Sequence, residues 1–313
     1  MPEYSKSLGC GDAKFIYNPE QTIYSIPIGV SKADTSVTIR GRAVGTIILA
    51  DGAADAEDIK LEMVLRSDKK ELLDGVKFRY PTIDDIKEGL SESIVHLDTP
   101  TTMDSCMRYD IVLRVPPALK ELSIKASSVT QLKFAEDAQV TLDSLRVSLQ
   151  AIGGKSDLSM VLPHANVRAK QLSLATYNGW LVGDVSIVDS TELATHQGAA
   201  VMNVHVYPRA ADTTALLTTR SGNGRADVFY ESDPGAPHRA IASTHRGRKG
   251  DLYLTYKNAE FAGHVNVKAK SWSATGLQDA FNRTSTELPW VGDKNGGDML
   301  TAESPSGWVG LYF

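Results

Sequence analysis

The second half of the chain repeats with a step of 24 residues, and this repeat limits the possible folds more than any other feature of the sequence. Shorter related copies precede it near Leu149 and Leu174, and residues 300–313 resemble the unit once more. The positions that keep the step form five series: Leu193, Leu217 and Ile241; Thr195, Thr219 and Ser243; Asn203, Asp227 and Asp251; Val204, Val228 and Leu252; and Val206, Tyr230 and Leu254. A period of this length is typical of chains built from stacked structural units.

Each unit reads as a short strand, a turn with glycine, and then an Asn or Asp followed by a strand with alternating apolar residues. Glycine supplies the positive φ that many turns need, and an Asn or Asp side chain bonds the nearby backbone at a corner. One unit cannot bury its apolar face alone, whereas stacked units form a continuous core. The sequence therefore predicts an all-β protein containing a β-solenoid, with Leu193, Leu217 and Ile241 as direct neighbours on successive coils. A β-sandwich is the alternative architecture.

The N-terminal half also reads as strands. Residues 59–65 alternate between apolar and polar side chains, and the alternating segment 110–115 stops at Pro116. Short helices are expected only within the charged segments 68–75 and 83–93. We divide the chain into a flexible tail at 1–12, an N-terminal β region at 13–120 that packs on or continues the solenoid, and the solenoid repeats at 121–313. A single continuous domain over 13–313 is the alternative division.

Composition and the chain termini narrow the functional classes. A formal charge of −5 over 313 residues argues against general binding to nucleic acid or to anionic membranes. No apolar run is long enough to cross a bilayer as a helix, and residues 1–11 lack the apolar segment of a signal peptide. We therefore expect a cytoplasmic protein, present at a cell surface only if it is exported by a non-classical route. Cys10 and Cys106 are accordingly expected to be free thiols.

The sequence carries no recognisable catalytic or metal-binding motif. It lacks the Gly-x-Ser-x-Gly elbow, the His-Glu-x-x-His pattern and Cys-x-x-Cys pairs. The run 153–156, Gly-Gly-Lys-Ser, resembles the end of a phosphate-binding loop, but Leu149 occupies the position of that loop's first glycine. We interpret the recurring Asp184, Asp227 and Asp251 as corner caps. The sequence therefore predicts a protein that is not an enzyme, with no catalytic residues, no metal and no cofactor.

A small set of polar and aromatic residues in the repeats is a candidate for ligand binding. Stacking at the repeat step would bring His196 close to Arg220 and Thr244. The turn 245–249 is the densest basic segment, and the regular spacing of Tyr207, Tyr230 and Tyr253, one position short of the repeat step, predicts a slanting exterior ladder. Exposed rings bind sugars by stacking, although a solvated polar face and a stiffening ladder explain the same residues. The candidate ligand-binding residues are His196, Arg220, Tyr230, Tyr253, His245, Arg246 and Arg248.

Three features carry a resemblance to a known family. The segment 107–116, Met-Arg-Tyr-Asp-Ile-Val-Leu-Arg-Val-Pro, runs as a strand into a proline; Thr-x-x-Gly corners recur at 176–179, 195–198 and 219–222; and the chain ends on Gly-Trp-Val-Gly-Leu-Tyr-Phe at 307–313. In these features residues 15–313 resemble the adhesin-like β-solenoid domains, in particular the uncharacterised ones of mushroom-forming fungi. The resemblance implies a single-stranded β-helix with a surface or cell-contact role, and it supplies no catalytic residues.

These observations favour a non-enzymatic, adhesin-like structural or binding protein that presents repetitive β-faces. Its expected partners are further copies of itself, in an oligomer or filament, or a glycan or cell-wall component. A cytosolic carbohydrate-binding lectin is the second hypothesis. A β-helix polysaccharide lyase or hydrolase is the third, and it requires an acidic and basic cluster that departs from the repeat pattern. No nucleic-acid partner and no membrane insertion are expected.

Overall fold

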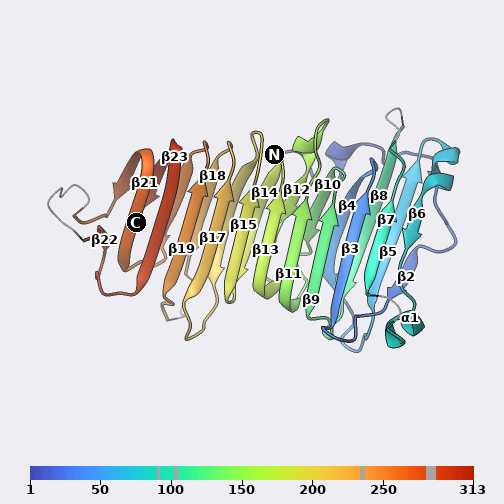
Figure 1. The fold of residues 1–313 in the computed structure, drawn as a ribbon, viewed down its shortest axis with the longest axis horizontal. Helices are drawn as coiled ribbons and strands as arrows, with labels where there is room; N and C mark the ends of the chain where they lie inside the picture. The colour runs from blue at the N-terminus through green and yellow to red at the C-terminus, as the bar shows by residue number, and fades with distance from the viewer. Residues whose placement is uncertain (90–91, 102–104, 233–236, 280–286) are drawn as a thin grey trace.

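The computed structural model describes residues 1–89, 92–101, 105–232, 237–279 and 287–313. These residues are almost entirely β-structure, and their 23 strands join in one long, mostly parallel sheet that does not close on itself. The sheet winds as a flattened solenoid, in which most coils contribute one strand to each of two faces (Figure 1). The predicted all-β fold with a β-solenoid is confirmed.

The strands of the N-terminal part are β1 (Phe15–Ile16), β2 (Ile23–Ile26), β3 (Asp34–Arg40), β4 (Val44–Asp51), β5 (Ile59–Ser67), β6 (Lys77–Arg79), β7 (Ile94–Asp98) and β8 (Met107–Val115). The following coils contain β9 (Glu121–Ala126), β10 (Thr130–Phe134), β11 (Thr141–Leu149), β12 (Met160–Leu162), β13 (Arg168–Thr176), β14 (Trp180–Ile187), β15 (Ser190–Thr195) and β16 (Val201–Pro208). The last strands are β17 (Ala215–Ser221), β18 (Ala226–Glu231), β19 (Ile241–Gly247), β20 (Leu252–Asn258), β21 (Gly263–Thr275), β22 (Trp290–Val291) and β23 (Asp298–Tyr312).

Helical structure is short and lies mainly in the predicted segments. The 3-10 helix η2 (Lys70–Gly75) and the α-helix α1 (Ile83–Lys87) fall within the charged stretches, and η1 (Lys6–Leu8) and η3 (Ser156–Leu158) are single turns. α1 begins with a capping box between Thr82 and Asp85, which satisfies backbone groups at its first turn. Among the described helices, none has the length and apolar character of a membrane-spanning segment.

Two ladders of parallel strands form the faces of the solenoid. The first face has the spatial order β7, β3, β9, β11, β13, β15, β17, β19. The second face has the order β8, β4, β10, β12, β14, β16, β18, β20. Apolar side chains alternate inward from both faces; Leu174 and Leu193, for example, are paired neighbours with no exposed surface. The core therefore lies between the two faces and continues along the whole solenoid.

The predicted contact between Leu193, Leu217 and Ile241 is wrong by two residues. Leu193 pairs with Thr219, and Ala215 pairs with Ile241, so the register between these strands of the first face is two residues longer than the sequence step. On the second face the register equals the sequence step from β16 to β18 and again exceeds it by two from β18 to β20. Because side chains alternate with a period of two, a two-residue shift leaves each one on the same side of the sheet. The inward apolar pattern therefore survives the shift.

The coils do not stack in chain order at either end. The coil of β3 and β4 lies between that of β7 and β8 and that of β9 and β10. At the other end β23 returns to fill the place between β21 and the coil of β19 and β20, and the short β22 pairs antiparallel on the far edge of β21. The final repeat thus stacks directly on the third unit, although residues 259–297 separate them in the sequence. Antiparallel strands complete the N-terminal end: β6 on β7, β5 on β8, and β1 and β2 on β5.

The corner glycines serve close packing as much as backbone conformation. Gly198 has the predicted positive φ, at 64°. Gly224, Gly250 and Gly307 do not, but a Cβ on each would overlap the carbonyl oxygen of the coil on which it stacks. These three glycines therefore let successive corners approach more closely than any side chain would allow.

The N-terminal segment, expected to be a flexible tail, lies against the second face. Leu8 is buried, and the Arg108 guanidinium donates to the carbonyl oxygens of Ser5 (2.9 Å) and Gly9 (3.1 Å). A disulfide then joins Cys10 to Cys106, 96 residues further along the chain. The expectation of two free thiols is therefore wrong.

Candidate functional site

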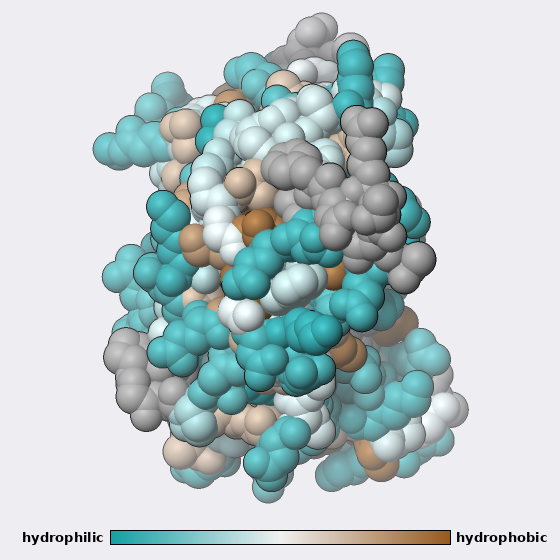
Figure 2. All heavy atoms as spheres, turned by 90° about the vertical axis from the view of Figure 1, so that its left-hand side faces the viewer, coloured by the Kyte–Doolittle hydropathy of each residue, from teal (hydrophilic) through white to brown (hydrophobic). Residues whose placement is uncertain are grey.

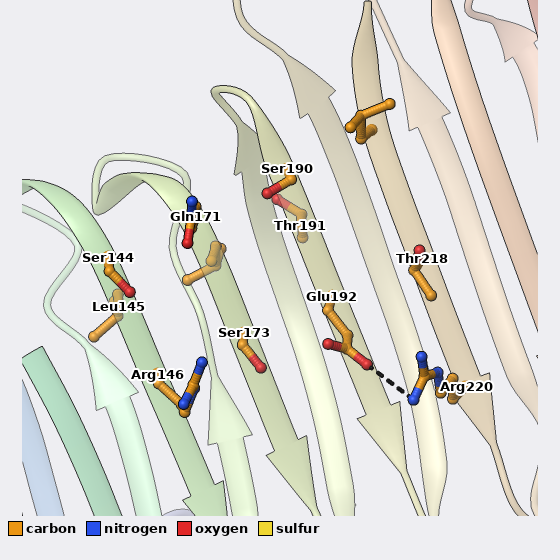
Figure 3. A pocket seen from close by; sticks show the side chains of 12 residues that line it. Ser144, Leu145, Arg146, Gln171, Ser173, Ser190, Thr191, Glu192, Thr218 and Arg220 are labelled. Atoms are coloured by element: carbon orange, nitrogen blue, oxygen red, sulfur yellow. Dashed lines mark ion pairs between the residues drawn. The ribbon is translucent and has the colours of Figure 1, made fainter.

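A shallow groove crosses the first face over β11, β13, β15 and β17. These strands pair in parallel without a break in register at the groove, so their outward side chains form straight rows. One row contains Ser144, Gln171, Ser190 and Leu216, and the next contains Arg146, Ser173, Glu192 and Thr218. Figure 3 shows the polar side chains of both rows above the ribbon, each from a different strand.

The groove has a volume of about 300 Å³ and a basic residue toward each end. Arg146 extends from β11 and is exposed. Arg220 extends from β17, and its Nη1 lies 3.4 Å from Oε1 of Glu192, with more than two-fifths of both side chains exposed (Figure 3). An exposed ion pair of this kind contributes little to stability. The pair is therefore free to rearrange around a bound molecule.

The lining suits hydrogen bonding to an extended polar ligand. Its hydroxyl and amide groups both donate and accept, while the two guanidinium groups present several donors in a fixed plane. Neither histidine nor cysteine is among the lining residues. The chemistry offered by this groove is recognition along a line that crosses the strands.

Arg220 is the one predicted site residue that lies in the groove. The predicted cluster with His196 and Thr244 does not form, because Arg220 pairs with Ala194 and Arg246. His196 lies beyond the end of β15 and is exposed. Thr244 pairs with Thr218 instead. The two-residue difference between the sequence step and the true register accounts for the separation.

Two further predicted residues, His245 and Tyr230, are buried in the core and belong to no surface site. His245 Nδ1 lies 2.8 Å from Thr219 Oγ1, and its Nε2 lies 2.8 Å from the hydroxyl of Tyr256. Burial lowers the pKa of His245 to about 3, and burial raises the pKa of Tyr230 well above its ordinary value. The ring of Tyr230 stacks on that of Tyr256, with centroids 5.2 Å apart.

The predicted exterior tyrosine ladder is therefore wrong. Tyr230 and Tyr253 are separated by an odd number of positions. The strand pairs Asp227 with Tyr253, Val228 with Leu254 and Phe229 with Thr255 are each separated by an even number. An odd spacing on an even register places the two rings on opposite sides of the sheet. Tyr230 points inward, and Tyr253 points outward on the second face.

The basic residues at the end of β19 and just after it contact side chains of the neighbouring coils. Arg246 Nε lies 3.2 Å from Oε2 of Glu303, and Arg248 donates to Oδ1 of Asn223 at 3.1 Å. Both arginines are exposed, and Arg246 pairs with the groove residue Arg220, but neither arginine is among the residues that line the groove. His245, which was expected in the same exposed turn, is on the inner side of β19.

The recurring carboxylates do not share one role as corner caps. Asp184 and Asp227 lie within strands, and Asp227 accepts two hydrogen bonds from the Arg225 guanidinium at 2.6 and 2.7 Å. Asp251 stands at the start of β20, where its Oδ1 accepts from the backbone N–H of Trp308 at 2.8 Å. Asp251 thus binds a backbone N–H group at a corner, but that group belongs to β23 instead of its own turn.

Sequence reasoning missed the rest of the groove. The lining residues other than Arg220 that extend from the outer surface are Ser144, Arg146, Gln171, Ser173, Ser190, Glu192, Leu216 and Thr218. Their signal is the polar half of each alternating strand, which resembles any solvated face. Only the alignment of four strands turns these separate positions into rows.

Comparison with known proteins does not place the chain in a family. No protein-family model matches the sequence, and no curated protein matches it. Among solved structures, the chain is similar to a "putative cell adhesion protein" from Clostridium sporogenes, with a TM-score of 0.27 and 10% identity over 93% of this chain and 98% of that chain. A similarity at this level identifies neither a family nor a function.

Proposed function

We propose that the protein is an adhesin-like binding protein without catalytic activity, and that its first-face groove holds an extended glycan from a cell surface or cell wall. The observation that carries this proposal is the pair of straight polar rows across β11, β13, β15 and β17. Neighbouring strands are about 4.8 Å apart, so an extended chain lying across them would meet at least one polar side chain on each strand. Arg146 and Arg220 add donors suited to a carboxylate-bearing sugar.

The disulfide supports this role. Disulfides persist in oxidising environments outside the cytoplasm. A working location at a cell surface therefore fits the bond between Cys10 and Cys106 better than the cytoplasm that the sequence suggested.

The proposal does not extend to end-to-end assembly. At the C-terminal end β22 covers only Gly263 and His264 of β21, and the rest of this edge strand exposes Lys268 and Lys270, charges of the kind that discourage pairing at a sheet edge. The surface at this end is mostly hydrophilic, with small and separate apolar areas (Figure 2). Light scattering over a range of concentrations should give the mass of a monomer, and growth with concentration would contradict this part of the proposal.

A glycan array tests the proposed ligand class. The labelled wild-type protein should bind a subset of polysaccharides, with uronic-acid-containing chains among them. The double substitution Arg146→Ala and Gln171→Ala should abolish this binding. Lys60→Ala, which removes an exposed charge on β5 far from the groove, is the matched control and should leave binding unchanged.

Two outcomes would overturn the proposal. One is the absence of binding across arrays of plant, fungal, bacterial and animal glycans, or binding that the double variant retains. The other is release of reducing ends from a bound polysaccharide, which would show that the groove performs a reaction.

A further inference from the structure

The second face carries a cluster of planar side chains that the groove does not use. Two outward rows cross β18, β20 and β23 near the C-terminal end. One row contains Asp227, Tyr253 and Gly310, because Asp227 pairs with Tyr253 and Tyr253 pairs with Gly310. In the same register the neighbouring row contains Arg225, Asp251 and Trp308. Because these residues come from three successive coils, their arrangement depends on the insertion of β23 beside β20.

The indole of Trp308 lies across the backbone of Gly310. A Cβ on Gly310 would overlap the six-membered ring of the indole, so the absence of a side chain there allows the ring to lie flat. The ring of Tyr253 meets it from the side, with centroids 5.0 Å apart and planes at 58°. Trp308 is half-buried. Since its inner face rests on the backbone and one side on Tyr253, its outer face is the surface left to solvent.

Charged groups surround this ring. The Arg225 guanidinium lies 3.8 Å from the centroid of the Tyr253 ring and is held in place by its two hydrogen bonds to Asp227. Asp251 is exposed beside Trp308, and its carboxylate already accepts the backbone N–H of that residue. A flat apolar surface is thus bordered by a fixed set of hydrogen-bond acceptors and one cation.

We infer that Trp308, Tyr253, Asp251 and Arg225 form a binding site for a single uncharged pyranose unit. A pyranose has an apolar C–H face that packs on an aromatic ring, and hydroxyl groups at its edge that donate to carboxylates and accept from guanidinium groups. The two carboxylates disfavour an anionic ligand by like-charge repulsion. This site therefore selects a neutral sugar. It lies on the opposite face from the groove, and it shares no residue with the proposed groove site.

Saturation-transfer NMR and calorimetric titration with a panel of neutral disaccharides (cellobiose, chitobiose, mannobiose, lactose and maltose) test the inference. At least one should bind in the millimolar range with its ring protons close to an aromatic side chain. Trp308→Ala should weaken that binding more than tenfold, and Trp308→Phe should retain part of it. Asp251→Asn, which keeps an oxygen for the Trp308 backbone bond, should weaken binding without unfolding the chain.

The groove variant Arg146→Ala separates the two sites. It should leave disaccharide binding unchanged, even if it abolishes binding to polysaccharides. The inference is overturned if none of the five disaccharides binds, or if the one that binds is unaffected by both Trp308→Ala and Asp251→Asn. Binding that is lost in Arg146→Ala but kept in the Trp308 variants would assign the sugar to the groove instead.

Discussion

The buried His245 should make the stability of the fold depend on pH in a defined direction. The imidazole has no exposed surface, and its two nitrogens face the hydroxyl groups of Thr219 and Tyr256. No carboxylate contact accompanies these hydrogen bonds among the described residues. A proton added to the ring would therefore place an unpaired charge in the core, which is why burial lowers its pKa to about 3 from an ordinary value of 6.5.

The sign and size of the effect follow from this difference. In the unfolded chain His245 binds a proton as the pH falls through 6.5, whereas in the folded chain it stays neutral until about pH 3. Protonation of the unfolded state lowers the free energy of unfolding, so full stability holds above pH 6.5 and is lost progressively toward pH 3. At pH 5, about 1.5 units below the ordinary pKa, protonation of His245 in the unfolded chain lowers the free energy of unfolding by about 2 kcal/mol.

The measurement is urea-induced unfolding at pH 8 and pH 5, for wild type and for His245→Gln. The glutamine side chain retains a donor and an acceptor but does not titrate in this range. The variant is expected to be less stable at both pH values, because its geometry differs. The decisive quantity is the change between the two pH values, which should be about 2 kcal/mol larger in the wild type. Equal changes in the two proteins would refute the assignment of a neutral buried imidazole.

Three further substitutions test the contacts that hold the coils together. Asp298→Ala should lower the free energy of unfolding by about 3 kcal/mol in urea titrations, because the buried carboxylate accepts hydrogen bonds from two backbone N–H groups at 2.8 and 2.7 Å. Glu303→Ala, which removes a partly exposed ion-pair partner, should lower it by less than about 1 kcal/mol. Gly250→Ala should cost about 1–3 kcal/mol by the same assay, since its Cβ would overlap the preceding coil, whereas Gly11→Ala should be nearly neutral; similar values for both would contradict the close-packing argument. Cys10→Ser should lower the free energy of unfolding by about 2–4 kcal/mol, which a lower midpoint of thermal unfolding would report. An unchanged midpoint would show that the disulfide does not constrain the fold.

The predicted and observed site residues differ for one geometric reason. The sequence step and the register between β15, β17 and β19 differ by an even number of positions, so periodicity assigns the correct side of the sheet but the wrong neighbour. Arg220 was therefore predicted on the surface correctly, yet its neighbours are Ala194 and Arg246 instead of His196. Tyr230 fails differently, because its odd spacing from Tyr253 reverses the side.

The amino-acid sequence by itself determined the all-β class, the inward alternation of apolar residues, the stop at Pro116, the helical segments within 68–75 and 83–93 and the stacking of repeats, because each of these follows from local alternation and turn chemistry. The tertiary structure alone decided the register between coils, the position of β23 between β21 and the coil of β19 and β20, and the bond between Cys10 and Cys106. It also brought Arg146, Glu192 and Arg220 together in one groove. These features join residues from different coils. Their partners are selected by close packing along the whole solenoid, and that selection leaves no periodic trace in the chain.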